Sequence, residues 1–119
     1  MAVVSKRLIT PKLITNSSVL TYTSPVNNIT KDIEFHFTNV DATTTIGVTL
    51  YMVENGGSAG DSNTFLKESG AGAFLLSPGE TRSWSTEQTM EAGDTVYVKA
   101  STTLKVSMFM SGRQISQGA

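Results

Sequence analysis

The chain has 119 residues and a mass of 12.7 kDa, which suits one domain with a single hydrophobic core. Thr and Ser together make up 31 residues, only 16% of the chain is charged and the net charge is −1, so the composition disfavours a helical bundle and a nucleic-acid partner. The absence of cysteine excludes disulfides and thiol catalysis, and the single histidine excludes a multi-histidine metal site within one chain.

The alternation of apolar and polar residues has a period of two, which is typical of half-buried strands. In chain order it predicts strands over 2–9, 17–23, 33–37, 46–52, 72–76, 82–88, 96–100 and 104–110, with the third, fourth, seventh and eighth the clearest. The residues that share the apolar side of the clearest strands predict a core of Ile33, Phe35, Phe37, Ile46, Val48, Leu50, Val96, Val98, Val106 and Met108.

Turn sequences separate these strands. Ser77-Pro78-Gly79-Glu80 is an example, because proline presets φ for a β-turn and glycine tolerates a positive φ. The longest irregular segment is expected from Glu54 to Ser69, and no window shows a helical stripe. Regular strand spacing without crossover helices predicts an all-β fold. We expect a single antiparallel β-sandwich or jelly roll of about eight short strands, spanning residues 1–119 as one domain.

The sequence shows no sign of a membrane-spanning helix or of an export signal. No apolar run approaches the roughly 20 residues that a membrane-spanning helix needs. The N-terminal sequence MAVVSKRLIT also lacks the continuous apolar stretch of a secretory signal. We therefore expect a soluble protein that is made inside the cell and has no membrane partner.

Charge is unevenly distributed along the chain. Residues 1–31 contain Lys6, Arg7, Lys12 and Lys31 and no acidic residue, whereas all the acidic residues follow. Two interpretations of residues 1–12 follow from this asymmetry. They form either a basic docking arm or an edge strand that positive charge protects from unwanted pairing.

Motifs for ligand binding are weak. The glycine-rich stretch 55–61 lacks the lysine and helix of a phosphate-binding loop, so it is interpreted as a flexible surface loop. Glu54, Asp61 and Asn63 offer oxygen ligands, but their spacing does not match a calcium-binding loop of the EF-hand type. We expect neither a metal nor a cofactor.

Catalytic motifs are equally weak. His36 lies on the polar side of its strand beside Glu34, and no serine lies in a nucleophile elbow, so a solvent-facing or interface histidine is expected. Acid pairs such as Glu87 and Glu91 lie in turn-like sequence, where carboxylates are common for other reasons. The sequence therefore predicts a protein that is not an enzyme.

Three aromatic residues, Tyr51, Tyr97 and Phe109, fall on the polar sides of their strands. If the opposite sides form the core, these rings face outward among Thr, Ser and Lys side chains. Such a surface suits contact with a protein or with a carbohydrate. The alternative is a sandwich in which loops cover both sides of these strands.

Short strings in a fixed order resemble small β-sandwich proteins from the structural gene clusters of tailed bacteriophages. They are Tyr22–Pro25, Phe37–Asn39, Leu50–Val53, Gly56–Asp61, Leu66, Pro78–Thr81, Glu91–Thr95, Ala100–Ser101 and Ser111–Gly112. The resemblance covers residues 20–112 and does not extend to the basic start, residues 1–19.

The resemblance implies a non-enzymatic virion protein, made in the host cytoplasm. The expected role is a capsid decoration or cement protein, acting as a homotrimer that contacts itself and the major capsid protein or other virion proteins. The expected interface residues are Lys6, Arg7, Lys12, Tyr51, Tyr97 and Phe109. The alternatives are a tail, neck or fibre accessory protein, and a carbohydrate-binding module that stacks sugars on Tyr51, Tyr97 or Trp84.

Overall fold

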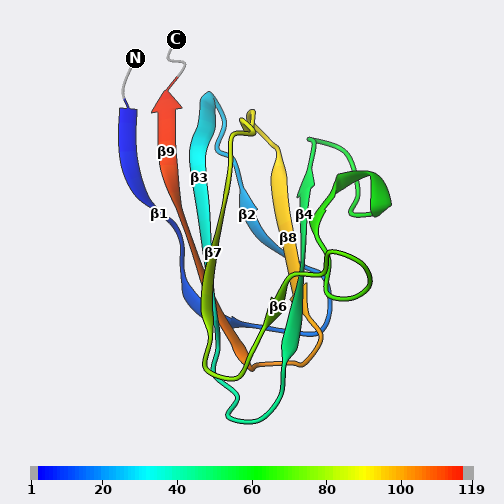
Figure 1. Ribbon diagram of the computed structural model, residues 1–119. Helices are drawn as coiled ribbons and strands as arrows, with labels where there is room; N and C mark the ends of the chain where they lie inside the picture. The colour runs from blue at the N-terminus through cyan, green and yellow to red at the C-terminus, as the bar shows by residue number, and fades with distance from the viewer. Residues whose placement is uncertain (1–2, 117–119) are drawn as a thin grey trace.

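The computed structural model describes the backbone of residues 3–116 and the side chains of residues 7–116, and it has two antiparallel sheets packed face to face (Figure 1). Its strands are β1 (Val3–Ile14), β2 (Val19–Thr23), β3 (Asn28–Asn39), β4 (Ile46–Val53), β5 (Thr64–Leu66), β6 (Leu75–Leu76), β7 (Thr81–Thr86), β8 (Thr95–Ala100) and β9 (Val106–Ser116). A short 3-10 turn, η1 (Asp61–Asn63), precedes β5.

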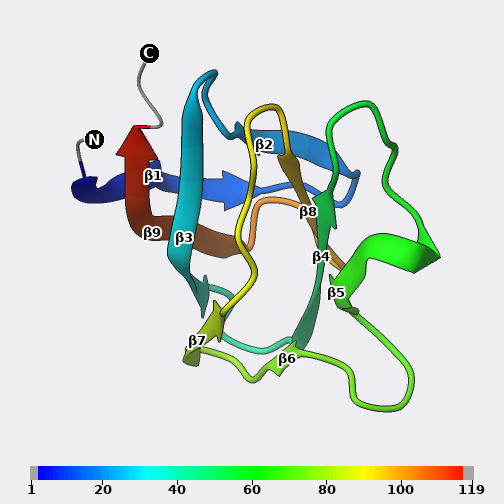
Figure 2. The ribbon, with the colours of Figure 1, turned by 90° about the horizontal axis from the view of Figure 1, so that it is seen from above.

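The strand order is that of a jelly roll. Sheet A has the order β1-β9-β3-β7 and sheet B the order β2-β8-β4-β5, with β6 pairing with β4. Strands that follow each other in the chain, such as β1, β2, β3 and β4, therefore lie in alternate sheets, and the view from above separates the two layers (Figure 2). The predicted all-β antiparallel sandwich is confirmed.

Several strands are longer than the alternation predicts. β1 continues past residue 9 to Ile14, β3 begins at Asn28, and β9 continues to Ser116. In β1 and β3 the pairing with β9 shifts register, so an extra residue changes which side of the strand faces inward. The segment expected to be irregular, Glu54 to Ser69, contains η1 and the three-residue strand β5.

The core lies between the sheets and contains all ten predicted residues, each with no more than 1% of its surface exposed. Phe35 is central, because its ring stacks with Phe37 at 6.2 Å between centroids and with Trp84 at 5.9 Å. Residues that the alternation did not select complete the core: Ile9, Ile14, Val53, Leu66, Phe74, Leu76, Met90, Ala100, Met110 and Ile115.

Buried polar groups close the two ends of the sandwich. At the end where β3 leads into β4, the lower end in Figure 1, the fully buried Asn39 amide donates to the carbonyl oxygens of Thr44 (2.7 Å) and Leu76 (3.0 Å). At the upper end, the Thr30 hydroxyl lies 2.9 Å from the hydroxyls of both Tyr22 and Ser24. Every buried side-chain nitrogen or oxygen among the described residues has a hydrogen-bond partner, so neither end carries an uncompensated polar group.

Replacing Phe35 with Ala is expected to lower the free energy of unfolding by about 3–5 kcal/mol, because it leaves a cavity beside two stacked rings. Denaturant unfolding followed by circular dichroism measures this loss. Val40→Ala is the control, since Val40 is 54% exposed and its truncation should change stability by no more than about 0.5 kcal/mol. Equal losses in the two variants would contradict the assignment of the core.

Candidate functional site

The outer face of sheet B carries a row of large side chains across its strands. Leu20 of β2 pairs with Tyr97 of β8, which pairs with Tyr51 of β4. Leu20 is 47% exposed, and both tyrosines are partly exposed. We call these three residues the aromatic row. The structure thus places Tyr51 and Tyr97 side by side on an outward face, while their role in an interface stays a prediction.

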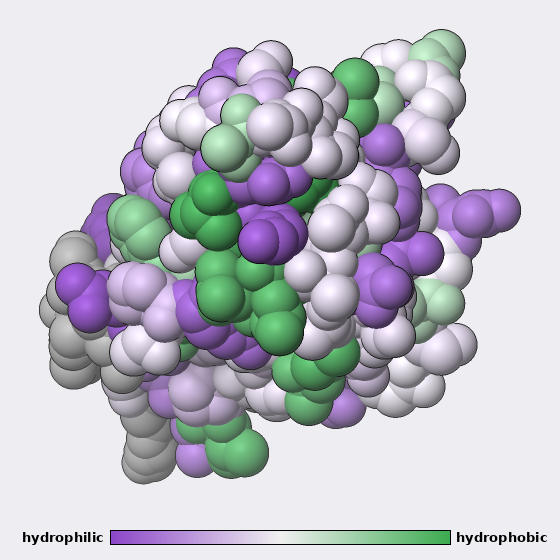
Figure 3. All heavy atoms as spheres, turned by 90° about the horizontal axis from the view of Figure 1, so that it is seen from below, coloured by the Kyte–Doolittle hydropathy of each residue, from purple (hydrophilic) through white to green (hydrophobic). Residues whose placement is uncertain are grey.

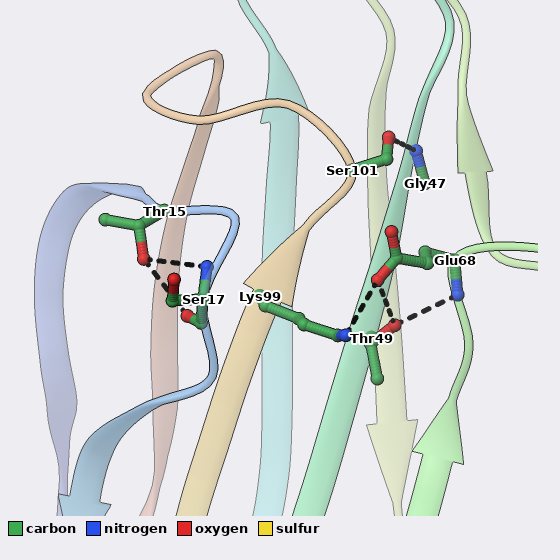
Figure 4. A network of polar contacts seen from close by, with 7 residues as sticks. All are labelled: Thr15, Ser17, Gly47, Thr49, Glu68, Lys99 and Ser101. Atoms are coloured by element: carbon green, nitrogen blue, oxygen red, sulfur yellow. Dashed lines mark hydrogen bonds and ion pairs between the residues drawn. The ribbon is translucent and has the colours of Figure 1, made fainter.

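A polar network holds the segment after β5 against this face (Figure 4). Glu68 accepts a hydrogen bond from the Thr49 hydroxyl at 3.1 Å, and its carboxylate lies 3.4 Å from Lys99 Nζ. The backbone N–H of Glu68 in turn donates to the Thr49 hydroxyl at 3.1 Å. The network therefore clamps the chain at Glu68 onto β4 and β8.

Gly47 lets this segment approach the sheet closely. A Cβ atom at position 47 would lie 2.1 Å from the backbone oxygen of Glu68, well inside any normal contact. Beyond that point, Phe74 donates its N–H to the Lys67 oxygen and accepts a bond from the Val48 N–H. The loop between β5 and β6 is thus anchored to β4 at both of its ends.

An open groove of about 820 Å³ is lined by this loop and, from the aromatic row, by Tyr51. Its lining includes Tyr51, Asp61, Phe65 and Lys99, so it offers aromatic, acidic and basic groups. Trp84 does not lie on the same surface as the tyrosines, because its ring packs on Phe35 at 5.9 Å and meets Phe65 edge-on at 6.0 Å. In the carbohydrate alternative, Tyr51 and Tyr97 therefore stay candidates for stacking sugars, whereas Trp84 contributes to core packing.

The outer face of sheet A has one aromatic pair at its centre. Phe109 of β9 and His36 of β3 are cross-strand partners, and their rings stack at 4.4 Å. His36 Nε2 lies 2.6 Å from Glu34 Oε1, and Ser85 donates to the other oxygen of Glu34 at 3.1 Å. The serine therefore bonds the acid and not the histidine, which differs from the order of a catalytic triad.

The basic start of the chain is an edge strand of sheet A and not a free arm. Val3–Ile14 pairs with β9, and Ile9 and Ile14 are buried in the core. Arg7 and Lys12 are exposed, whereas the side chain of Lys6 lies outside the described residues. A docking role for these cations stays a prediction.

The lower end of the sandwich shows a third surface. Backbone hydrogen bonds join Val40 to Lys105 and Leu104 to Ile14 there, so exposed Leu13, Val40 and Leu104 share one end. Figure 3 shows apolar residues gathered on this end. Beside it, a hydrogen bond with the Thr44 side chain lowers the pKa of Asp41, and the charge of Lys105 lowers it further.

The oxygen ligands considered in the glycine-rich region serve the local backbone. Asn63 accepts a hydrogen bond from the Gly60 N–H and donates to the Ser58 oxygen. Within the described part of the chain, no group of three His, Asp or Glu side chains is placed to hold a metal ion. The same residues include no helix with the length and hydropathy to cross a membrane.

Comparison with known proteins shows similarity in fold. No protein-family model and no curated protein matches the sequence. A chain of the Bacillus endospore appendages, described as disulfide-linked pili, shares the fold with a TM-score of 0.54 and 16% identity, covering 98% of this chain and 89% of that one. A chain of infectious bursal disease virus, Gx strain, has a TM-score of 0.54 and 12% identity, covering 98% of this chain and 32% of that one.

Gly47→Ala is expected to destabilise the protein by about 1–3 kcal/mol, because the new methyl group collides with the backbone at Glu68. Hydrogen exchange at the Phe74 and Val48 N–H groups should accelerate, since both depend on the seated loop. Gly60→Ala is the matched control, because a Cβ there meets no atom within 4 Å. Unchanged exchange in Gly47→Ala would show that the loop does not depend on this close approach.

Proposed function

We propose that this protein is a non-enzymatic structural component of a bacteriophage virion, and that it decorates the capsid. The observation that carries the proposal is the aromatic row, because exposed Leu20 and partly exposed Tyr97 and Tyr51 lie side by side on the outer face of sheet B. Clustered, partly exposed rings are typical of protein–protein contacts. The sequence resemblance to phage structural proteins and the fold shared with a viral chain and a pilus chain support the same role.

The proposed mechanism is stabilisation by linkage. A protein that binds the assembled shell and not its separated subunits shifts the equilibrium toward the shell. A homotrimer suits a local three-fold site, because symmetry lets each copy repeat the same contact with the capsid protein. In this arrangement the aromatic row supplies apolar area, and exposed Lys12 of β1 supplies charge complementarity.

Purified virions should contain this protein on the order of hundreds of copies, because a decoration protein follows the symmetry of the whole capsid. Quantitative mass spectrometry against the major capsid protein measures the ratio. A copy number of about a dozen or fewer would favour the tail, neck or fibre alternative, since those structures have low-order symmetry. Absence from the particle would contradict a virion role and leave the glycan-binding alternative.

Lys12→Glu is expected to weaken binding to virions about tenfold at low salt, because it reverses an exposed charge on the basic edge strand. The difference from wild type should shrink as salt rises, since charges are screened over about 10 Å at 0.1 M. Co-sedimentation with particles stripped of this protein is the measurement. Lys67→Glu is the control, an exposed lysine on the loop after β5. Equal effects of the two variants would show that net charge, and not the position of β1, governs binding.

A further inference from the structure

The register of sheet A arranges its outward side chains in rows across the four strands. One row contains Arg7 of β1, Ser111 of β9, Glu34 of β3 and Ser85 of β7. The next contains Phe109, His36 and Ser83, and the third contains Leu13, Ser107, Thr38 and Thr81. Apart from Leu13 and the stacked rings of Phe109 and His36, these side chains are small or charged. The face therefore carries few large apolar groups.

Charge changes sign along the first of these rows. Arg7 lies on β1 and Glu34 on β3, with the uncharged Ser111 between them on β9. Neighbouring strands lie about 4.8 Å apart, so the two charges are separated by about 10 Å, with β9 midway. A rotation by 180° about an axis parallel to β9 therefore brings Arg7 over Glu34 of a second copy, and Glu34 over that copy's Arg7.

The same axis places the most apolar part of the face at its centre. Phe109 is on β9, so it would meet Phe109 of the second copy on the axis, flanked by the two charge pairs. Aromatic anchors near the centre and charges near the rim are the arrangement that stable interfaces favour. Arg113, further along β9, is already paired with Asp32 at 2.7 Å, so its charge is compensated within each copy.

The area is sufficient for such a contact. Three strands of 11 or 12 residues and one of six residues, at about 4.8 Å spacing and about 3.3 Å per residue, give a face of roughly 650 Å². Stable interfaces of standard size bury roughly 600–1,000 Å² per partner. Two sheets that pack face to face with their strands nearly aligned are also one of the two common packings of β-sheets.

Pairing through the edge of sheet A is a poorer route to association. The β1 register shifts twice, between Arg7 and Ile9 and between Ile9 and Lys12, and Pro11 lies in the second shift without an N–H to donate. Exposed cations along the strand oppose a second basic strand. Contact between copies is therefore directed to the faces.

We propose that the outer face of sheet A is a two-fold interface with a second copy of this chain, with β9 on the axis. This interface goes beyond the proposed function, because it forms between purified chains without a particle. The homotrimer proposed above closes through other surfaces, and the two-fold contact then joins copies from neighbouring trimers.

A charge swap tests the pairing of Arg7 with Glu34. Arg7→Glu alone and Glu34→Arg alone should each raise the dissociation constant of the two-fold contact at least about tenfold, because each creates two like-charge contacts per dimer. The double variant should return to within about threefold of wild type, since both pairs are restored with opposite sign. Sedimentation equilibrium of the full chain gives these constants, and thermal melting checks that each variant folds.

The rescue separates an interface from a structural role. Glu34→Arg also loses the contacts of Glu34 with His36 and Ser85, and the double variant loses them equally. A purely structural role would therefore leave the double variant no better than Glu34→Arg. Failure of rescue, or a wild-type chain that stays monomeric at millimolar concentration, would overturn the proposal.

Cross-linking tests the position of the axis independently. The chain has no cysteine, so Ser111→Cys introduces one thiol beside the axis, and a short bis-maleimide reagent should join two copies rapidly. Ser83→Cys is the matched control on the same face, because β7 lies two strands from β9 and its mate would be about 19 Å away. Equal rates for the two variants would place the contact elsewhere and overturn the proposal. Because both tests use the purified chain, their failure leaves the virion role unaffected.

Discussion

The rest of the structure depends on the dry layer between the two sheets, where Phe35 and Phe37 are fully buried. Both belong to β3, which lies between β9 and β7 inside sheet A. Because side chains alternate along a strand, burying these two rings turns the intervening His36 outward at the centre of the opposite face. The stack of His36 on Phe109 is thus a consequence of core packing. The side chains that alternate with the buried residues determine the character of the outer face.

Alternation predicts the core well and the strand ends poorly, for a physical reason. It selects the ten most regular core positions because each sheet buries only one of its faces. An extra residue in a strand reverses the phase, as between Ile9 and Lys12 of β1 and near Asp32 of β3, where φ is +54°. Outward Tyr51, Tyr97 and Phe109 are predictable because they are out of phase with the core. Leu20 beside Tyr97, and Glu68 against Thr49 and Lys99, depend on which strands become neighbours, and alternation carries no such information.

Low identity with a pilus chain and a viral chain is compatible with a common fold because the fold makes few chemical demands. The interior requires apolar side chains of suitable volume at alternate positions, and many sequences meet that requirement. The outer faces carry no such constraint, so they are free to take up different contacts in different proteins. At 16% and 12% identity, function therefore has to be argued from the aromatic row and the outer face of sheet A, and not from the shared topology.

The proposed association through faces also determines what kind of assembly the chain can build. The open edges at β1 and β2 are interrupted by register shifts, which limits the strand-to-strand addition that leads to uncontrolled growth. A two-fold contact alone closes after two copies, and a three-fold contact alone closes after three. An extended shell needs a second, independent contact for each copy. The two sheets of this sandwich turn their outer faces in opposite directions, so one copy can use both faces at once, and its partners on the two sides do not compete for the same surface.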